Sequence, residues 1–306
     1  MATDEGCNRT QICRNAIRRS PLMARWLVTG AGGMLAHDLL PRLTDAGHDV
    51  TPLTRTDLDI TDASACRAAV EGHDVVANLA AWTAVDDAES HEGAAFAVNA
   101  LGAANVAAAC ERSSARLVHV STDYVFSGDT STPYAVNAPV APRSAYGRTK
   151  AAGEWAVLAH CPTALVVRTA WLYGAGGPNF VATISRLATE RDTIAVVDDQ
   201  HGQPTWTADL AEAIPRLVEA DAQGGVWHGT GSGQTTWFDF ARAIFEELGL
   251  DPERVTPTTT ASFPRPAPRP TFSVLDDAKW RTHGLDPLPH WRDGLNRAAP
   301  SVLRTS

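Results

Sequence analysis

The stretch VTGAGGMLA, which runs from Val28 to Ala36, decides how this chain folds. It joins a short apolar segment to a segment with the apolar spacing of a helix, and its pattern is Gly30-x-x-Gly33-x-x-Ala36. Glycine also occurs in plain turns. Between a strand and a helix, however, it lets the backbone approach a pyrophosphate, whose charge is favoured at the helix N-terminus. The stretch therefore predicts the first βαβ unit of a dinucleotide-binding fold.

The segments that follow continue this alternation of strand and helix. The expected strands are 25–30, 48–55, 74–81, 115–122 and 163–174, and the expected helices are 34–47, 62–72, 91–113 and 146–161. The strands are nearly continuous runs of Val, Leu and Ala, which is typical of a parallel sheet buried on both faces. The fold class predicted is α/β, a Rossmann-like doubly wound parallel sheet with a smaller α/β substrate-binding domain.

The domain boundaries follow from where the rhythm changes. Residues 1–22 lack periodicity, and Met23 opens the first apolar segment, so 1–22 are expected to form a flexible N-terminal extension. Residues 23–175 form the NAD(P)-binding domain, to which segments near 194–220 return. Residues 176–306 form mainly the substrate-binding domain, with a Pro-rich ordered loop at 262–272.

Composition narrows the partners and the compartment. The formal net charge is −9 and no Lys/Arg-dense run stands out, which argues against nucleic acid. No apolar run looks long enough to span a bilayer. The five cysteines are scattered without zinc-site spacing, and an odd number without a secretion signal favours reduced thiols and a cytoplasmic protein.

The tip of the second strand bears on the choice of cofactor. Arginine there accommodates the 2′-phosphate of NADPH, whereas a carboxylate binds the ribose 2′-OH of NADH. Arg55 at the tip favours NADPH, and Asp57 nearby keeps NADH open.

Tyr146 and Lys150 lie four residues apart in SAYGRTKAAGE and therefore share a helix face. Most such pairs only decorate a surface, but Ser121 and Thr122 end the fourth strand, where ligands bind in this fold. Reduction of a ketone needs a hydride at carbon and a proton at oxygen. We expect Tyr146 to supply the proton, Lys150 to lower its pKa, and Thr122 to align the carbonyl.

The glycine loop, the Ser/Thr at the strand end and the Tyr-x-x-x-Lys pair together resemble the extended short-chain dehydrogenase/reductase superfamily. From Met23 onward the chain resembles the dTDP-4-dehydrorhamnose reductase family, through GAGGMLA, NLAAWTAVDDAE, VSTDYVFSG, YGRTKAAGE, DDQHGQPT and FPRPAPRP in this order. The resemblance implies NAD(P)H-dependent reduction of the 4-keto group of a dTDP-4-dehydro-6-deoxy-L-hexose in deoxysugar biosynthesis.

The resemblance also implies roles for single residues. The catalytic set is Thr122, Tyr146 and Lys150. The cofactor side comprises Gly30, Gly32, Gly33, Met34, Leu35, Arg55, Asp59, Ile60, Ala80, Ala81, Thr83 and Asn99, with Tyr146 and Lys150. The dTDP-sugar side comprises Thr83, Val85, Thr122, Asp123, Tyr124, Trp171, Asn179, Phe180, Gln203 and Arg269. Trp171 fits the core as well as the pocket, and His228 is read as a packed or capping histidine.

Some positions depart from the family pattern, and several alternatives follow. Trp82, Ser127, Ala135 and Asn137 differ around the pocket, which leaves the sugar open and admits the ring-contracting dihydrostreptose synthase branch. A non-catalytic regulatory subunit is another alternative. So is an epimerase or a 4,6-dehydratase, although Asp123 has no adjacent glutamate. No metal is expected, and the protein is expected to be a monomer or a homodimer.

Overall fold

The computed structural model describes residues 23–303, so the expected extension 1–22 lies outside the described residues. Its centre is a six-stranded parallel sheet in the order β10-β5-β4-β3-β1-β2. The strands are β1 (Arg25–Thr29), β2 (Asp49–Leu53), β3 (Val75–Asn78), β4 (Arg116–Thr122), β5 (Leu165–Thr169) and β10 (Gly225–His228). The strand order reverses between β1 and β3, and this switch point is where such sheets bind ligands. The expected doubly wound fold is confirmed.

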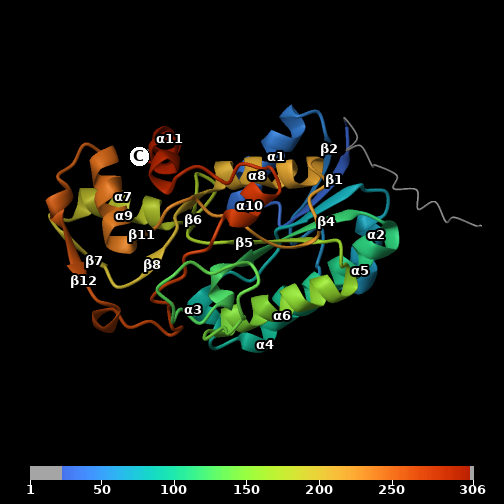
Figure 1. Cartoon of the computed structure of the whole chain (residues 1–306), viewed down its shortest axis with the longest axis horizontal. Helices are drawn as coiled ribbons and strands as arrows, with labels where there is room; N and C mark the ends of the chain where they lie inside the picture. Colours follow the sequence, from blue (N-terminus) through green and yellow to red (C-terminus); the bar gives the residue numbers. More distant parts are fainter. Residues whose placement is uncertain (1–22, 304–306) are drawn as a thin grey trace, which may run out of the picture.

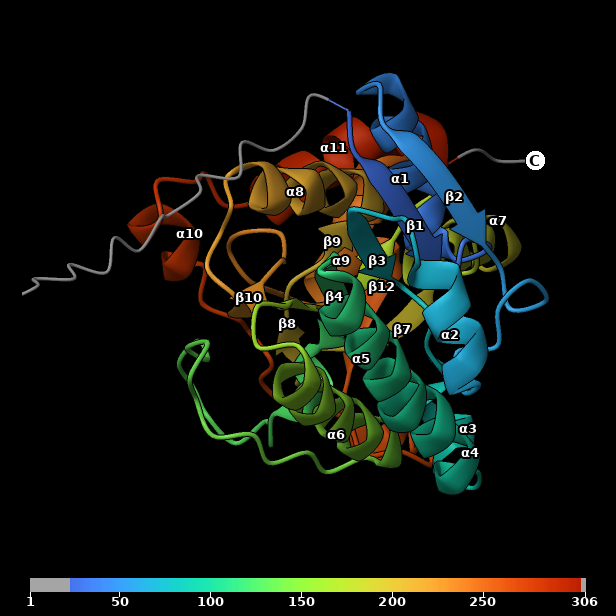
Figure 2. The same cartoon turned by 90° about the vertical axis from the view of Figure 1, so that its right-hand side faces the viewer.

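Helices cover both faces of the sheet (Figure 2). One face carries α1 (Met34–Asp45) and α8 (Thr207–Glu219), and the other carries α2 (Ala63–Val70), α5 (Ala103–Ser113) and α6 (Ala145–His160). The first strand shows the two-sided burial, because Trp26 and Val28 pack toward α1 and α8 while Leu27 packs toward α2 and α5. This is the pattern expected of apolar strands in a parallel sheet.

The expected helix 91–113 begins at Glu92 and contains a π-helical turn. It comprises α4 (Glu92–Phe96), η1 (Ala97–Gly102) and α5. Gly153 of α6 sits against the π turn, where a Cβ would lie 2.1 Å from the Asn99 carbonyl oxygen, so only glycine allows this close helix contact. Contrary to the sequence expectation, residues 92–113 are long and apolar enough for a membrane span, but half of this helix is buried in the fold.

The expected strand 163–174 is broken after Thr169. Trp171 has φ +47, and the chain turns there before β6 (Leu172–Tyr173) pairs with β9 (Thr205–Trp206). The turn directs the chain away from the sheet and into the second unit.

The second unit lies beside the carboxyl ends of the strands, on the left of Figure 1. It contains α7 (Phe180–Glu190), α9 (Trp237–Glu247) and α11 (Trp291–Val302), with β7 (Ile194–Val197) paired to β12 (Val255–Thr258) and β8 (His201–Gly202) to β11 (Thr235–Thr236). The remaining short elements are α3 (Val85–Ala88), η2 (Asp123–Val125), η3 (Pro252–Arg254), η4 (Thr260–Ser262) and α10 (Ala278–Thr282).

Of the segment 194–220 that was expected to return to the first domain, α8 packs against the sheet. The strands β7 and β8 belong to the second unit, whereas α8 and β10 rejoin the sheet. The short apolar run of β10 gives no local sign of its partner, because pairing with β5 is a long-range contact.

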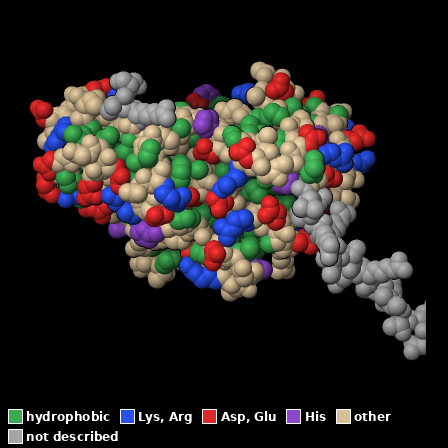
Figure 3. All heavy atoms as spheres, turned by 90° about the horizontal axis from the view of Figure 1, so that it is seen from above, with side chains coloured by type: hydrophobic (Ala, Val, Ile, Leu, Met, Phe, Trp, Pro, Cys, Tyr) green, Lys and Arg blue, Asp and Glu red, His purple; other side chains and the backbone are tan. Residues whose placement is uncertain are grey.

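On the face shown in Figure 3, acidic and basic side chains lie interspersed.

Candidate active site

A cavity of about 1210 Å³ opens at the carboxyl ends of β1 to β5. It exceeds the usual range of about 300–1,000 Å³ for a small-ligand pocket, so it can take two ligands side by side. The structure brings most of the predicted site residues into its wall. They are Gly30, Gly32, Gly33, Met34, Leu35, Arg55, Asp59, Ile60, Ala80, Ala81, Thr83, Val85, Thr122, Asp123, Tyr124, Tyr146, Lys150 and Trp171.

The glycine loop forms a cradle that side chains would fill. Gly30 has φ +69, and a Cβ there would lie 2.7 Å from the Ala80 nitrogen. Gly33 caps α1 without any side-chain hydrogen bond, so no side chain occupies the first N–H groups of the helix. A helix N-terminus open in this way suits a pyrophosphate. These residues therefore fit a dinucleotide.

The tip of β2 forms the far end of the cavity. Asp57 accepts hydrogen bonds from the Thr54 nitrogen at 2.9 Å and the Thr54 hydroxyl at 2.6 Å, and both bonds lower the pKa of its carboxyl. Asp57 is thereby tied to its own loop. Arg55 lines the cavity and makes no hydrogen bond or ion pair within residues 23–303. Among the described residues the guanidinium of Arg55 thus has no hydrogen bond, while one oxygen of the Asp57 carboxylate, Oδ2, is occupied by Thr54.

Tyr146 lies in the first turn of α6, which follows the Ser144 cap, and its hydroxyl lies near Thr122 at the end of β4. Burial raises the pKa of Tyr146 to about 12. Lys150 lies one turn further, where its Nζ donates to the Val120 carbonyl at 2.7 Å and burial lowers its pKa to about 8. The expectation that Lys150, together with the cationic nicotinamide of the oxidised cofactor, lowers the pKa of the phenol stays a prediction, because in the ligand-free site desolvation is the largest influence on that pKa.

Asp123 is buried next to Thr122. Its carboxyl accepts a hydrogen bond from the Thr122 hydroxyl at 3.0 Å, and burial raises its pKa to about 6. The Tyr124 ring meets the Tyr146 ring edge to face at 5.7 Å. Thr122, Asp123 and Tyr124 therefore form one connected wall beside the reactive phenol.

Asn99 and Arg269 were predicted to bind ligands but lie outside the cavity wall. Asn99 is buried, and its amide holds both the nitrogen and the carbonyl of Trp82, at 2.8 and 3.1 Å. Arg269 forms an ion pair with Asp86 at 3.0 Å and lies over the Tyr124 ring. Both residues support the wall from behind.

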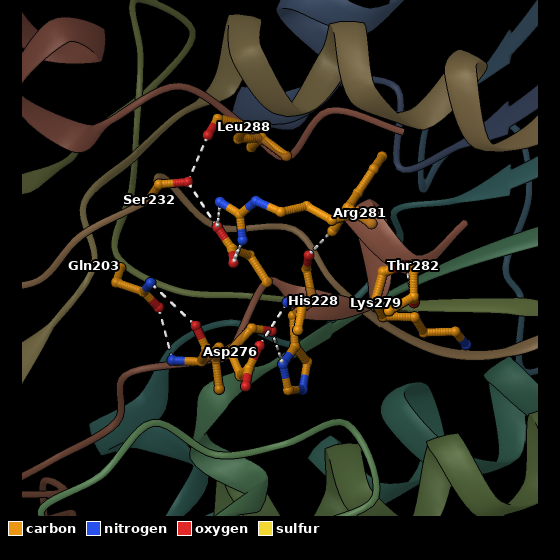
Figure 4. A network of polar contacts seen from close by, with 12 residues as sticks. Gln203, His228, Ser232, Asp276, Lys279, Arg281, Thr282 and Leu288 are labelled. Carbon is orange, nitrogen blue, oxygen red and sulfur yellow. Dashed lines mark hydrogen bonds and ion pairs between the residues drawn. The ribbon is translucent and has the colours of Figure 1, made fainter. Parts of the chain in front are cut away.

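Asn179, Phe180 and Gln203 also lie outside the cavity wall. Asn179 caps α7, and Phe180 packs against Trp237. The amide of Gln203, which is labelled in Figure 4, donates to the Leu275 carbonyl and accepts from the Leu275 nitrogen and the Thr230 hydroxyl. These side chains serve the second unit and its contact with the sheet.

The expectation for His228 is confirmed. The histidine is buried, its Nδ1 lies 2.9 Å from the Asp276 carbonyl (Figure 4), and burial lowers its pKa to about 3. It is therefore a neutral packed residue at physiological pH.

Several parts of the site were missed from sequence, among them Ala94, Ala97 and Val98 and the two that follow. The segment Gly176–Pro178 lines the cavity, and a Cβ on Gly176 would lie 2.4 Å from the Cβ of His37, so this loop covers the start of α1. Asp86 was also missed as the anchor of Arg269. The Gly/Pro cluster after Tyr173 was a signal for the first, but nothing local indicates the second. Within residues 23–303, no group of three or more His, Cys, Asp or Glu side chains could hold a metal.

Comparisons with known proteins agree with this site. A family model described as the RmlD substrate binding domain matches residues 24–303. A dTDP-4-dehydrorhamnose reductase of Streptomyces griseus is 53% identical, over 91% of this chain and 94% of that protein. A dTDP-4-keto-6-deoxy-D-glucose reductase of Streptomyces niveus is 50% identical, over 90% and 96%. The solved dTDP-4-dehydrorhamnose reductase of Bacillus anthracis, in complex with NADP, is 38% identical with a TM-score of 0.87, over 90% of this chain and 98% of that one.

Proposed function

We propose, since this chain belongs to the RmlD substrate binding domain family, that it is an NADPH-dependent ketoreductase of dTDP-sugars. The reaction proposed is reduction of the 4-keto group of a dTDP-4-dehydro-6-deoxy-L-hexose. The observation that carries the proposal is the position of Tyr146, Lys150 and Thr122 in the wall of the cavity that also contains the glycine cradle. The relatives are named for different sugar substrates, dTDP-4-dehydrorhamnose and dTDP-4-keto-6-deoxy-D-glucose, so the identity of the sugar is part of the proposal.

The chain's own residues account for the proton and the alignment. Bound NADPH would supply the hydride. Tyr146 carries its proton at physiological pH, and it can donate this proton to the developing alkoxide oxygen, which is a stronger base than the phenolate. The Thr122 hydroxyl donates to Asp123 in the ligand-free site, and it would turn from there to the carbonyl oxygen and fix this oxygen beside the phenol. Lys150 would hold the ribose next to the nicotinamide.

The cofactor preference follows from the β2 tip. Arg55 lines the cavity without a hydrogen bond or ion pair to any residue of 23–303, whereas Oδ2 of Asp57 accepts two hydrogen bonds from Thr54. A guanidinium binds phosphate oxygens with charge-assisted hydrogen bonds. We therefore assign Arg55 to the 2′-phosphate, with NADH as the weaker cofactor.

The sugar and its nucleotide are assigned to the opposite end of the cavity. Thr83, Val85, Asp123, Tyr124 and Trp171 line it there. The residues behind the wall act as supports in this proposal, and they are Asn99, Asn179, Phe180, Gln203 and Arg269. We place the reaction in the cytoplasm, which agrees with the free thiols of Cys66, Cys110 and Cys161. A monomer and a homodimer both fit.

The test is incubation of the protein with dTDP-4-dehydro-L-rhamnose and NADPH, followed at the NADPH absorbance, with the product identified by NMR. We expect dTDP-L-rhamnose. Tyr146→Phe should remove at least about 99% of the rate, while Tyr134→Phe, a tyrosine outside the cavity wall, should keep it. A furanose product would overturn the simple reduction, and no NADPH oxidation would overturn the ketoreductase assignment for this sugar.

A further inference from the structure

Trp171 has a backbone conformation that a bulky residue rarely adopts. Its φ is +47, in the left-handed region that favours glycine. The other non-glycine residues with positive φ among residues 23–303 are Ser114 and Asp221, and both follow helix ends. Trp171 instead lies between β5 and β6, in the wall of the cavity. Such strain persists only where the surroundings impose it, and it clusters at functional sites.

Three contacts hold Trp171 in this conformation. The Trp237 ring stacks on it with centroids 3.5 Å apart and planes 10° apart. Gly202 leaves room for the indole edge, because a Cβ there would lie 2.4 Å from Trp171 Cε2. The Thr205 nitrogen donates to the Trp171 carbonyl at 3.2 Å. All three contacts come from the second unit.

Trp237 begins α9 and does not line the cavity. Phe180 braces it from α7, with ring centroids 4.5 Å apart. Trp237 therefore contacts Trp171 through a face-to-face ring stack. The rest of α9 packs in the core of the second unit.

We propose that Trp237 is a positioning residue for the sugar-nucleotide site, and that it acts only by holding the Trp171 indole against the cavity. The proposal rests on the proposed function, since Trp171 is assigned there to the dTDP-sugar. Loss of the Trp237 ring frees the strained Trp171 to relax, and the wall of the substrate end loses its shape. The cofactor end is formed by β1 and β2 and keeps its geometry.

The variants are Trp237→Leu, Trp237→Phe and the matched control Phe245→Leu, which removes a buried aromatic ring of the same helix that has no ring contact with Trp171. For Trp237→Leu we expect the KM for the dTDP-sugar to rise about tenfold, which corresponds to about 1.4 kcal/mol, with the KM for NADPH unchanged. Trp237→Phe keeps a stacked ring and should restore most of the affinity. Phe245→Leu should lower the Tm without changing either KM.

A double variant tests whether Trp237 acts through Trp171. If it does, Trp171→Ala combined with Trp237→Leu binds no worse than Trp171→Ala alone, because effects of residues in one contact chain are not additive. Additive losses would overturn the proposal. So would equal KM changes in Trp237→Leu and Phe245→Leu.

Two readouts separate this inference from the proposed function. The stacked indoles should give an exciton couplet in circular dichroism that disappears in Trp237→Leu, without any turnover. If the wild type binds dTDP-L-rhamnose but reduces no ketone, the dissociation constant of dTDP-L-rhamnose, measured by calorimetry, takes the place of KM in these comparisons. That outcome would contradict the reductase assignment and would leave the role of Trp237 testable. A wild type that does not bind dTDP-L-rhamnose would overturn both.

Discussion

Replacing Lys150 with methionine should stabilise the ligand-free protein at pH 7. Lys150 is 2% exposed, and burial lowers its pKa from 10.5 to about 8. At about 1.36 kcal/mol per pKa unit, the buried charge costs about 3 kcal/mol of folding stability below pH 8. Methionine removes the charge but leaves the Val120 carbonyl without its ammonium donor, which costs about 1–2 kcal/mol. The net gain is about 1–2 kcal/mol.

The sign of this effect depends on pH. Below pH 8 the lysine is protonated in both states, so the whole cost is present. Between pH 8 and about 10.5 the folded lysine is neutral while the unfolded lysine still binds a proton, so wild-type stability rises with pH relative to the variant. Above that range only the lost hydrogen bond remains, and Lys150→Met should be the less stable protein.

Thermal unfolding without cofactor, followed by circular dichroism from pH 6.5 to 10.5, measures this crossover. We expect the Tm of Lys150→Met to lie about 2–4 °C above wild type at pH 7 and below it at the alkaline end. Lys279→Met is the matched control, because Lys279 also donates to a strand carbonyl, that of Val226 at 2.8 Å, but is only partly buried. A Tm difference for Lys150→Met that does not change with pH would refute the reasoning.

Three further outcomes are expected. Because burial holds the pKa of Tyr146 at about 12, kcat/KM for reduction should not fall through an ionisation of the phenol at any pH up to 10. A fall of kcat/KM below pH 10 that is absent in Tyr146→Phe would contradict this. Arg55→Ala should raise the KM for NADPH about tenfold and leave that for NADH unchanged, and equal rises would remove the 2′-phosphate assignment. Arg168→Met should lower the free energy of unfolding in urea by about 3–5 kcal/mol, since it strands the buried Glu154 carboxylate; a loss below about 1 kcal/mol would mean that the pair is solvated.

The sequence predicted those parts of the fold and site that depend on local pattern. The glycine spacing around Gly30 and Gly33 indicated the cradle, and the four-residue spacing of Tyr146 and Lys150 placed both side chains at the cavity. Continuous apolar strands indicated the parallel sheet. In each case the physical cause lies within a few residues of its effect.

The parts that were missed depend on contacts between distant segments. The π turn near Asn99 fits the close approach of Gly153, which is far along the chain. The break at Trp171 depends on Gly202 and Trp237. The spacing of apolar residues along the chain cannot indicate such contacts, because each of the contacting residues fits its own local secondary structure.

Burial sets the two groups of the site apart. The same desolvation raises the pKa of Tyr146 to about 12 and lowers that of Lys150 to about 8, so the two pKa values separate by several units although their ordinary values lie close together. A phenol with a raised pKa is protonated at neutral pH, but it is also a weaker acid, so burial alone favours neither direction of the reaction. A protonated Lys150 beside the oxidised, cationic cofactor would stabilise the phenolate and so oppose the effect of burial. The proton transfer at Tyr146 therefore depends on the charges next to the phenol when the site is filled.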